Sequence, residues 1–204
     1  MKKIKFFAVA AIFATIISCN SSTNETKTES QPVLSASYSI DTANSIVNWK
    51  GSMVGMYAHT GTLKFASGEF SLSEGKISGG SFTVDLKSML TTDDDALYKM
   101  APREKLIGHL LSDDFFSAEK FPTASFEFIS TDGSSLKGKL TIKGIANEVD
   151  VTDLFISETD GKVSATAKLV FDRQKFGVTY KSTMKDMVLS DDIELEISLN
   201  GIKK

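Results

Sequence analysis

Apolar and polar side chains alternate at every second residue along much of this chain, and this alternation limits the folds it can adopt. The pattern recurs in eight segments, from Val47–Lys50 through Ala165–Asp172 to Ile193–Asn200. A period of two places successive side chains on opposite faces of a strand, so each segment has one apolar face and one polar face. Strands of this kind are typical of antiparallel sheets, because strands buried in parallel sheets are apolar on both faces.

Short turn signals separate the segments. Many strands joined by such turns predict an all-β barrel or sandwich. The alternation also slips between Phe65 and Phe70, where Ala66–Gly68 predicts a β-bulge or a bend. In the resulting phase, Lys139, Lys168 and Glu196 face outward. The turn signals are Glu74-Gly75, Gly79-Gly80, Thr131–Gly133, Lys143-Gly144 and Asp160-Gly161.

The first residues read as a targeting segment rather than as part of the fold. Three lysines precede an uncharged apolar run, Phe6–Ile17, which is too short to span a bilayer as a helix. The run ends in Ile16-Ile17-Ser18-Cys19, which resembles a bacterial lipobox. We therefore predict a lipoprotein signal peptide over 1–18 and lipidation of Cys19, the only cysteine of the chain. The polar segment 19–36 is expected to be a flexible tether, and the folded domain to span 37–204.

One long segment, 91–122, interrupts the strand pattern. Pro102 followed by charged residues and then by leucines predicts a short amphipathic helix that begins at Arg103. Ser112–Asp114 then offers a cap for a second helical turn. An insertion of this length in a compact β domain is expected to form a lid or binding loop.

Composition and motifs exclude several classes of function. The 204 residues contain 23 Lys and Arg against 26 Asp and Glu, and a net charge of -3 argues against nucleic-acid binding through charge. One cysteine and two histidines, His59 and His109, exclude a zinc finger and a disulfide framework by number, and no metal or other cofactor is expected. No nucleophile motif is present, so both histidines are expected to be surface or hydrogen-bonded residues. The run Asp93–Asp95 is expected to be solvated.

A series of motifs is similar to the YceI-like family of bacterial periplasmic proteins. The resemblance runs from Tyr38 to the C-terminus, and its most specific parts are the 109–116 and 138–144 runs. One departure is Met53, which stands near the place where many members have a histidine. The motifs are Tyr-Ser-Ile-Asp at 38–41, Asn44-Ser45-x-Val47-x-Trp49, Gly61-Thr62-Leu63-Lys64-Phe65, Gly80-Ser81-Phe82-x-Val84-Asp85, Gly108-His109-Leu110-x-Ser112-Asp113-Asp114-Phe115-Phe116, Pro122-Thr123-Ala124-x-Phe126, Gly138-x-Leu140-Thr141-Ile142-Lys143-Gly144 and Asp172-Arg173-x-x-Phe176-Gly177.

The resemblance implies an extended eight-stranded antiparallel barrel of lipocalin type that binds a long polyisoprenoid or another amphiphile. It supplies no catalytic residues. The inward positions of such a barrel would form the apolar wall of the ligand site, the 103–116 segment would form a lid, and three cations are candidates for the headgroup. The expected wall residues are Trp49, Phe82, Val84, Phe126, Phe128, Leu140, Ile142, Leu169, Phe171 and Leu195, the lid residues Leu106, Leu110, Phe115 and Phe116, and the cations Arg103, Arg173 and Lys175.

Two functional hypotheses follow, and a third is weaker. The first is a lipid-anchored carrier or stress-linked buffer for an isoprenoid, quinone-like or fatty-acid-derived lipid, held to a bacterial membrane and facing the periplasm. The second is a scaffold lipoprotein whose barrel is filled with side chains and holds no ligand. The third, a hydrolase of envelope lipids, lacks a recognisable nucleophile. The sequence leaves open whether the barrel is hollow and whether two barrels pair as a homodimer.

Overall fold

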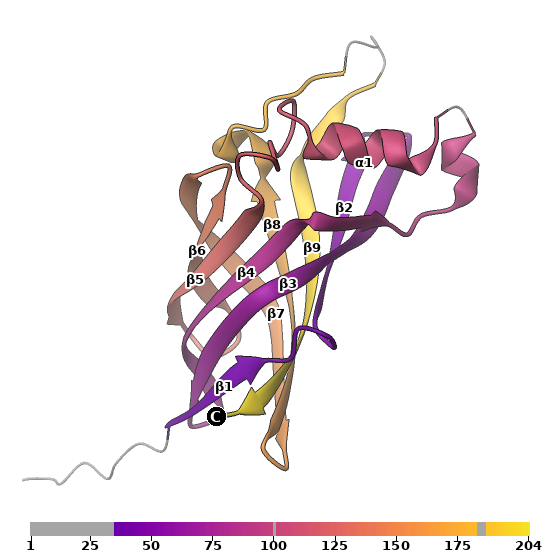
Figure 1. Ribbon diagram of the computed structural model, residues 1–204. Coiled ribbons are helices and arrows are strands. Elements are labelled where there is room, and N and C mark those ends of the chain that lie inside the picture. Colours follow the sequence, from indigo (N-terminus) through magenta and orange to yellow (C-terminus); the bar gives the residue numbers. More distant parts are fainter. Residues whose placement is uncertain (1–34, 100, 183–186) are drawn as a thin grey trace, which may run out of the picture. The chain divides into compact units, whose positions relative to one another are not determined.

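The computed structural model describes residues 35–99, 101–182 and 187–204, which form a single β-barrel with one α-helix across one end (Figure 1). All paired strands are antiparallel. The elements are β1 (Ser35–Ile40), β2 (Ile46–Met53), β3 (Tyr57–Ser73), β4 (Lys76–Thr91), the 3₁₀ helix η1 (Asp95–Tyr98), α1 (Arg103–Leu111), β5 (Thr123–Thr131), β6 (Leu136–Ile142), β7 (Ile145–Thr159), β8 (Lys162–Asp172), the 3₁₀ helix η2 (Arg173–Phe176) and β9 (Leu189–Lys203).

The barrel closes because β4 pairs with β3 as well as with β5. The strands β1 and β2 both lie between β3 and β9, one after the other, so nine strands fill eight positions. The predicted eight-stranded antiparallel barrel is therefore confirmed. Strand β1 was not among the eight predicted segments. Ser35 and Ala36, which were expected to belong to the tether, pair with Ser73 and Leu72 of β3.

Three hairpins turn through two residues that both have positive φ. The pairs are Glu74-Gly75, Lys143-Gly144 and Asp160-Gly161, with φ between 51° and 75°. Turns of this type match the right-handed twist of the flanking strands, and glycine adopts their second position without steric cost. The sequence signals for these three turns are confirmed.

The glycines of β4 correct one of the predicted turns. Gly79 and Gly80 lie inside the strand and pair with Ser71 and Phe70 of β3. A Cβ atom on Gly80 would lie 3.0 Å from the Cβ atom of Phe70 and 3.0 Å from the carbonyl oxygen of Glu69, so the glycine allows the close approach of β3 rather than a turn. The expected bulge at Ala66 is confirmed, because the register of β3 against β4 shifts between Phe65 and Ser67.

The two faces of each strand differ as the alternation predicts. In β8, Val163 is 2% exposed inside the barrel, whereas Val170 is 53% exposed on its outer surface. Leu140 and Leu169 are buried, and Lys168 is exposed. Two clusters of buried apolar side chains lie inside the barrel, and six partly buried residues pack against both of them: Phe82, Phe116, Ala124, Ile156, Leu195 and Ile197.

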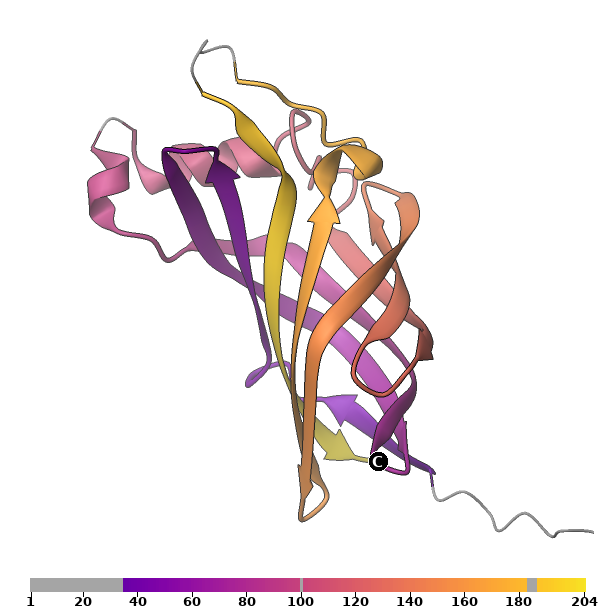
Figure 2. The ribbon, with the colours of Figure 1, turned by 180° about the vertical axis from the view of Figure 1, so that it is seen from behind.

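The two ends of the barrel are different, as Figures 1 and 2 show. The end at which β1 begins and β9 ends, here called the base, is packed around Tyr38 and Phe70, whose rings stack at 5.2 Å. The opposite end, here called the mouth, carries the β2–β3 hairpin, η2 and α1. None of the helices in the described ranges is long and apolar enough to cross a membrane. The predicted signal peptide and Cys19 lie outside the described residues.

Candidate functional site: an apolar cavity in the barrel

The barrel is hollow between its base and its mouth. A cavity of about 320 Å³, which is within the range of small-molecule sites, extends along the axis and is lined mostly by apolar side chains. This finding answers the question that composition left open, because a barrel of eight strands can be either filled or hollow. Nine of the ten expected wall residues line the cavity: Trp49, Phe82, Val84, Phe126, Leu140, Ile142, Leu169, Phe171 and Leu195.

Phe128 is the expected wall residue that does not reach the cavity. It packs instead against the core cluster around Leu136 and Val151. Phe128 still pairs in register with Gly138 of β6, and the register of β5 against β6 shifts only after it, between Phe128 and Ser130. Phe128 therefore belongs to the packing of the barrel rather than to the wall of the cavity.

Glycines create room for the aromatic part of the wall. Gly138 lies beneath Phe126, and a Cβ atom there would be 1.9 Å from the Cζ atom of that ring. Gly61 lies beneath Trp49, where a Cβ atom would be 2.5 Å from Cζ2 of the indole. The indole Nε1 is the one buried side-chain nitrogen or oxygen in the described part of the chain that has no hydrogen-bond partner. Its surroundings are therefore apolar.

The predicted helix is confirmed and lies across the mouth (Figure 1). Leu106 and Leu110 of α1 line the cavity, as do Phe115 and Phe116 of the following segment. That segment forms hydrogen-bonded turns instead of the second helical turn that we expected, with Phe115 N donating to Ser112 O at 3.2 Å. The four residues predicted for the lid are thus brought together over one cavity, and their contact with a ligand stays a prediction.

Phe115 is the central side chain of the lid. It is 8% exposed, and its ring centroid lies 5.0 Å from that of His109 and 4.9 Å from that of Tyr180. Ser112 holds the segment in place, because its Oγ donates to the carbonyl oxygen of His109 at 2.7 Å. The ring therefore enters the cavity from a segment whose backbone is fixed by the end of α1.

The structure does not bring the three candidate headgroup cations together at the cavity. Arg173 is 2% exposed and lines the cavity, but its guanidinium donates to Val178 O, Tyr180 O, Ser190 O and Asp191 Oδ1. This arginine ties the start of β9 to the segment that follows η2. Lys175 is exposed and is not part of the cavity lining.

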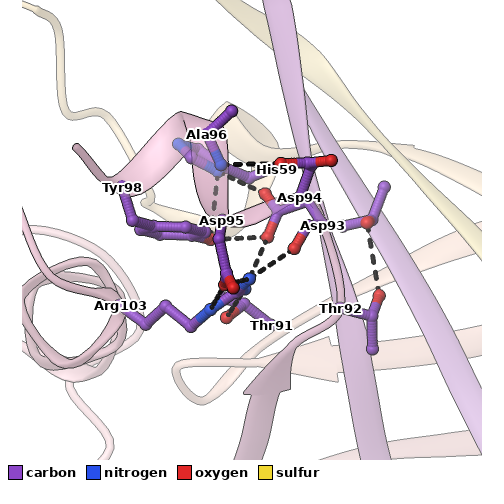
Figure 3. A network of polar contacts seen from close by, with 10 residues as sticks. His59, Thr91, Thr92, Asp93, Asp94, Asp95, Ala96, Tyr98 and Arg103 are labelled. Carbon is purple, nitrogen blue, oxygen red and sulfur yellow. Dashed lines mark hydrogen bonds and ion pairs between the residues drawn. The ribbon is translucent and has the colours of Figure 1, made fainter.

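Arg103, the third of these cations, belongs to a polar network beside the mouth (Figure 3). Its Nη1 atom donates to Thr91 Oγ1 at 2.9 Å and to Asp93 Oδ1 at 3.2 Å, and its Nη2 atom donates to Asp95 Oδ1. The guanidinium also lies 4.2 Å from the centre of the Tyr98 ring, in a cation–π contact. These interactions attach the start of α1 to the end of β4.

Asp93 is the buried centre of this network, and the expectation that the whole run 93–95 is solvated is wrong for it. Its side chain is 6% exposed, whereas that of Asp95 is 94% exposed. Burial alone would raise the pKa of Asp93, but hydrogen bonds from Tyr98 and His59 outweigh burial and lower it. Burial and the hydrogen bond to Asp93 raise the pKa of Tyr98. Asp93 is therefore an anion around which its neighbours are arranged.

Both histidines line the cavity, which the sequence analysis did not predict. His59 is hydrogen-bonded, as expected, through its Nδ1 atom to Asp93 Oδ2 at 2.6 Å. Its place could have been found from the alternation, because residue 59 has the same parity in β3 as the inward residues Leu63 and Phe65. The described residues include no cluster of three or more histidine, cysteine or acidic side chains that could hold a metal ion.

Comparison with known proteins identifies the family. The family model described as "YceI-like domain" matches residues 38–201. A UPF0312 protein of Pseudomonas fluorescens is 28% identical over 189 residues, which cover 84% of this chain and 89% of that protein. A UPF0312 protein of Staphylococcus aureus is 31% identical over 99 residues, 44% of this chain, so the match spans only 57% of that relative.

Two solved structures share the fold. Burkholderia cenocepacia BcnA aligns with a TM-score of 0.64 and 21% identity, over 79% of this chain and 98% of that one. A domain from Saccharophagus degradans, described as polyisoprenoid binding and implicated in plant cell wall breakdown, aligns with a TM-score of 0.59 and 13% identity, over 83% of this chain and 99% of that one. With the family model matching most of the chain and the barrel aligning with these structures, the chain belongs to the YceI-like domain family.

Proposed function

We propose that the protein binds one long-chain amphiphile, such as an isoprenoid, a quinone-like lipid or a fatty-acid-derived chain, inside the barrel. The observation that carries this proposal is the apolar cavity of about 320 Å³. An alkyl or prenyl chain has no hydrogen-bonding groups, so it needs apolar area and shape rather than placed polar atoms. The polyisoprenoid-binding description of the Saccharophagus degradans domain supports the same ligand class. The protein then acts as a carrier or buffer of that lipid.

The distribution of polar groups gives the ligand an orientation. The base is packed around Tyr38 and Phe70, whereas the mouth has Tyr57, His59 and His109 on its lining. A chain inserted through the mouth places its apolar end toward the base and leaves its polar headgroup among these side chains. Phe115 and the other lid residues then cover the chain near the headgroup.

Replacing Phe115 by alanine should weaken binding of a long-chain ligand at least tenfold. Burial of a phenylalanine side chain against the ligand is worth about 1.5–3 kcal/mol, and about 1.4 kcal/mol corresponds to a factor of ten. The measurement is a displacement titration with prenyl lipids on delipidated wild type and Phe115→Ala. Phe155→Ala is the matched control, because Phe155 is 71% exposed and lies outside the cavity lining.

The outcomes of this titration separate the two functional hypotheses. If wild type binds no amphiphile of any length, the carrier hypothesis is refuted. The scaffold hypothesis then remains, with a cavity that holds no ligand. If wild type and Phe115→Ala bind the ligand equally well, the carrier hypothesis stands, but Phe115 does not contact the ligand.

We further propose that Cys19 is lipidated and holds the barrel to a bacterial membrane on its periplasmic side. Two or three acyl chains, each contributing about 0.8 kcal/mol per buried CH₂ group, anchor a protein stably. Cys19→Ala should release the protein from the membrane fraction or leave its signal peptide uncleaved, as fractionation and the mass of the chain would show. Ser22→Ala is the control and should behave as wild type. Normal processing and full membrane retention of Cys19→Ala would contradict the anchor.

A further inference from the structure

His59 is held at the mouth of the cavity by groups on both sides of its ring. It stands on β3, lines the cavity and is packed edge-on against Tyr57, with ring centroids 5.2 Å apart. On its other side Asp93, which follows β4, accepts from Nδ1 at 2.6 Å. The imidazole is therefore fixed in place before any ligand arrives.

The contact with Asp93 determines which ring nitrogen faces a ligand. Asp93 forms an ion pair with Arg103 Nη1 at 3.2 Å and accepts from Tyr98 Oη at 2.6 Å, and its pKa is lowered by hydrogen bonds, so its carboxyl group is ionised and can only accept. Nδ1 of His59 must therefore carry a proton. Within the described residues, Nε2 has no hydrogen-bond partner, and it is not among the polar atoms that the protein encloses completely. Nε2 is thus left for a ligand atom.

The charges around His59 argue against an anionic headgroup. Arg103 is already paired with Asp93 and Asp95. The loop between β4 and α1 carries three carboxylates, those of Asp93–Asp95. The cations beside them are two, Arg103 at the start of α1 and the exposed Lys99. Arg173, the one arginine or lysine among the described residues that line the cavity, donates to three carbonyl oxygens and to Asp191. A phosphate group would meet net negative charge and no free guanidinium.

We propose that His59 Nε2 binds an uncharged, oxygen-bearing headgroup, a hydroxyl or a ring carbonyl, and that Asp93 is the positioning residue for His59. This inference rests on the proposed function and deepens it, because it names the headgroup class that the cavity selects. A hydroxyl group can donate to Nε2 when the imidazole is neutral, and a hydroxyl or carbonyl oxygen can accept from it when the imidazole is protonated.

The test compares three probes with the same branched chain: geranylgeraniol, its monophosphate and the oxygen-free hydrocarbon. Delipidated full-length wild type should bind the alcohol more tightly than the monophosphate. His59→Phe should weaken binding of the alcohol, relative to binding of the hydrocarbon, about 3- to 10-fold, as expected for one hydrogen bond. His59→Gln, which keeps a polar group near Nε2, should restore part of the alcohol's affinity.

Asp93→Asn tests the positioning role through a measurement that a purely structural role would not change. In wild type, the ¹⁵N shifts of the His59 ring should show a protonated Nδ1, and in Asp93→Asn they should show a mixture of tautomers. Affinity for the alcohol should fall with this change, while affinity for the hydrocarbon should stay that of wild type.

The possible failures point to different parts of the account. If wild type binds none of the three probes, the proposed function itself fails. If all three bind but His59→Phe weakens the alcohol and the hydrocarbon equally, His59 only shapes the wall and the headgroup assignment is overturned. If the monophosphate binds wild type more tightly than the alcohol, the uncharged class is overturned.

Discussion

Val163→Asn should lower the free energy of unfolding by about 2.5–6 kcal/mol. Val163 is 2% exposed and faces the packed interior near the base. Losing a buried valine costs about 1.5–3 kcal/mol, and burying an amide without partners adds about 1–3 kcal/mol. The measurement is the free energy of unfolding from urea denaturation.

Val170→Asn is the matched control, because it makes the same change in the same strand on the outer face. Val170 is 53% exposed, so its replacement should cost less than about 1 kcal/mol. Equal losses in the two variants would mean that the inward and outward faces of β8 are assigned incorrectly.

Ala167→Trp should weaken the binding of a long-chain lipid about 100-fold or more. Ala167 lines the cavity, so an indole there occupies space that the chain would fill. Excluding three or four CH₂ groups, each worth about 0.8 kcal/mol, removes about 3 kcal/mol of binding free energy. The same displacement titration measures the loss, and a stability measurement should show a cost of at most about 1–3 kcal/mol from overpacking.

Ser164→Trp is the control for this variant, since Ser164 is an exposed residue of β8 outside the lining of the cavity. It should bind lipid as wild type does. If Ala167→Trp also keeps wild-type affinity, the ligand does not lie in the barrel.

The barrel could be predicted from the sequence because alternation is a local property of each strand. Eight segments showed it, and the structure places Leu140, Leu169 and Lys168 on the predicted faces. Strand β1, which is additional to these eight segments, was missed because it is only six residues long and directly follows a polar segment. Gly79-Gly80 was misread as a turn, since a local pattern cannot show that Phe70 of the neighbouring strand needs the space above Gly80.

The hollow interior could not be predicted from composition. Both a filled and a hollow barrel need apolar inward residues, and the difference depends on how far apart the opposite walls stand. The roles of the cations also depend on the fold. The guanidinium of Arg173 donates to Ser190 and Asp191, which lie 17 and 18 residues further along the chain. These bonds use N–H groups that we had expected to contact a ligand headgroup.

Native mass spectrometry of the protein, purified without delipidation from the cells in which it occurs naturally, would show whether the barrel holds a lipid. We expect wild type to retain one lipid per barrel, which collisional release would identify as a long-chain amphiphile, and Ala167→Trp to be empty. Wild type without bound lipid, or wild type and Ala167→Trp with the same lipid occupancy, would contradict the account.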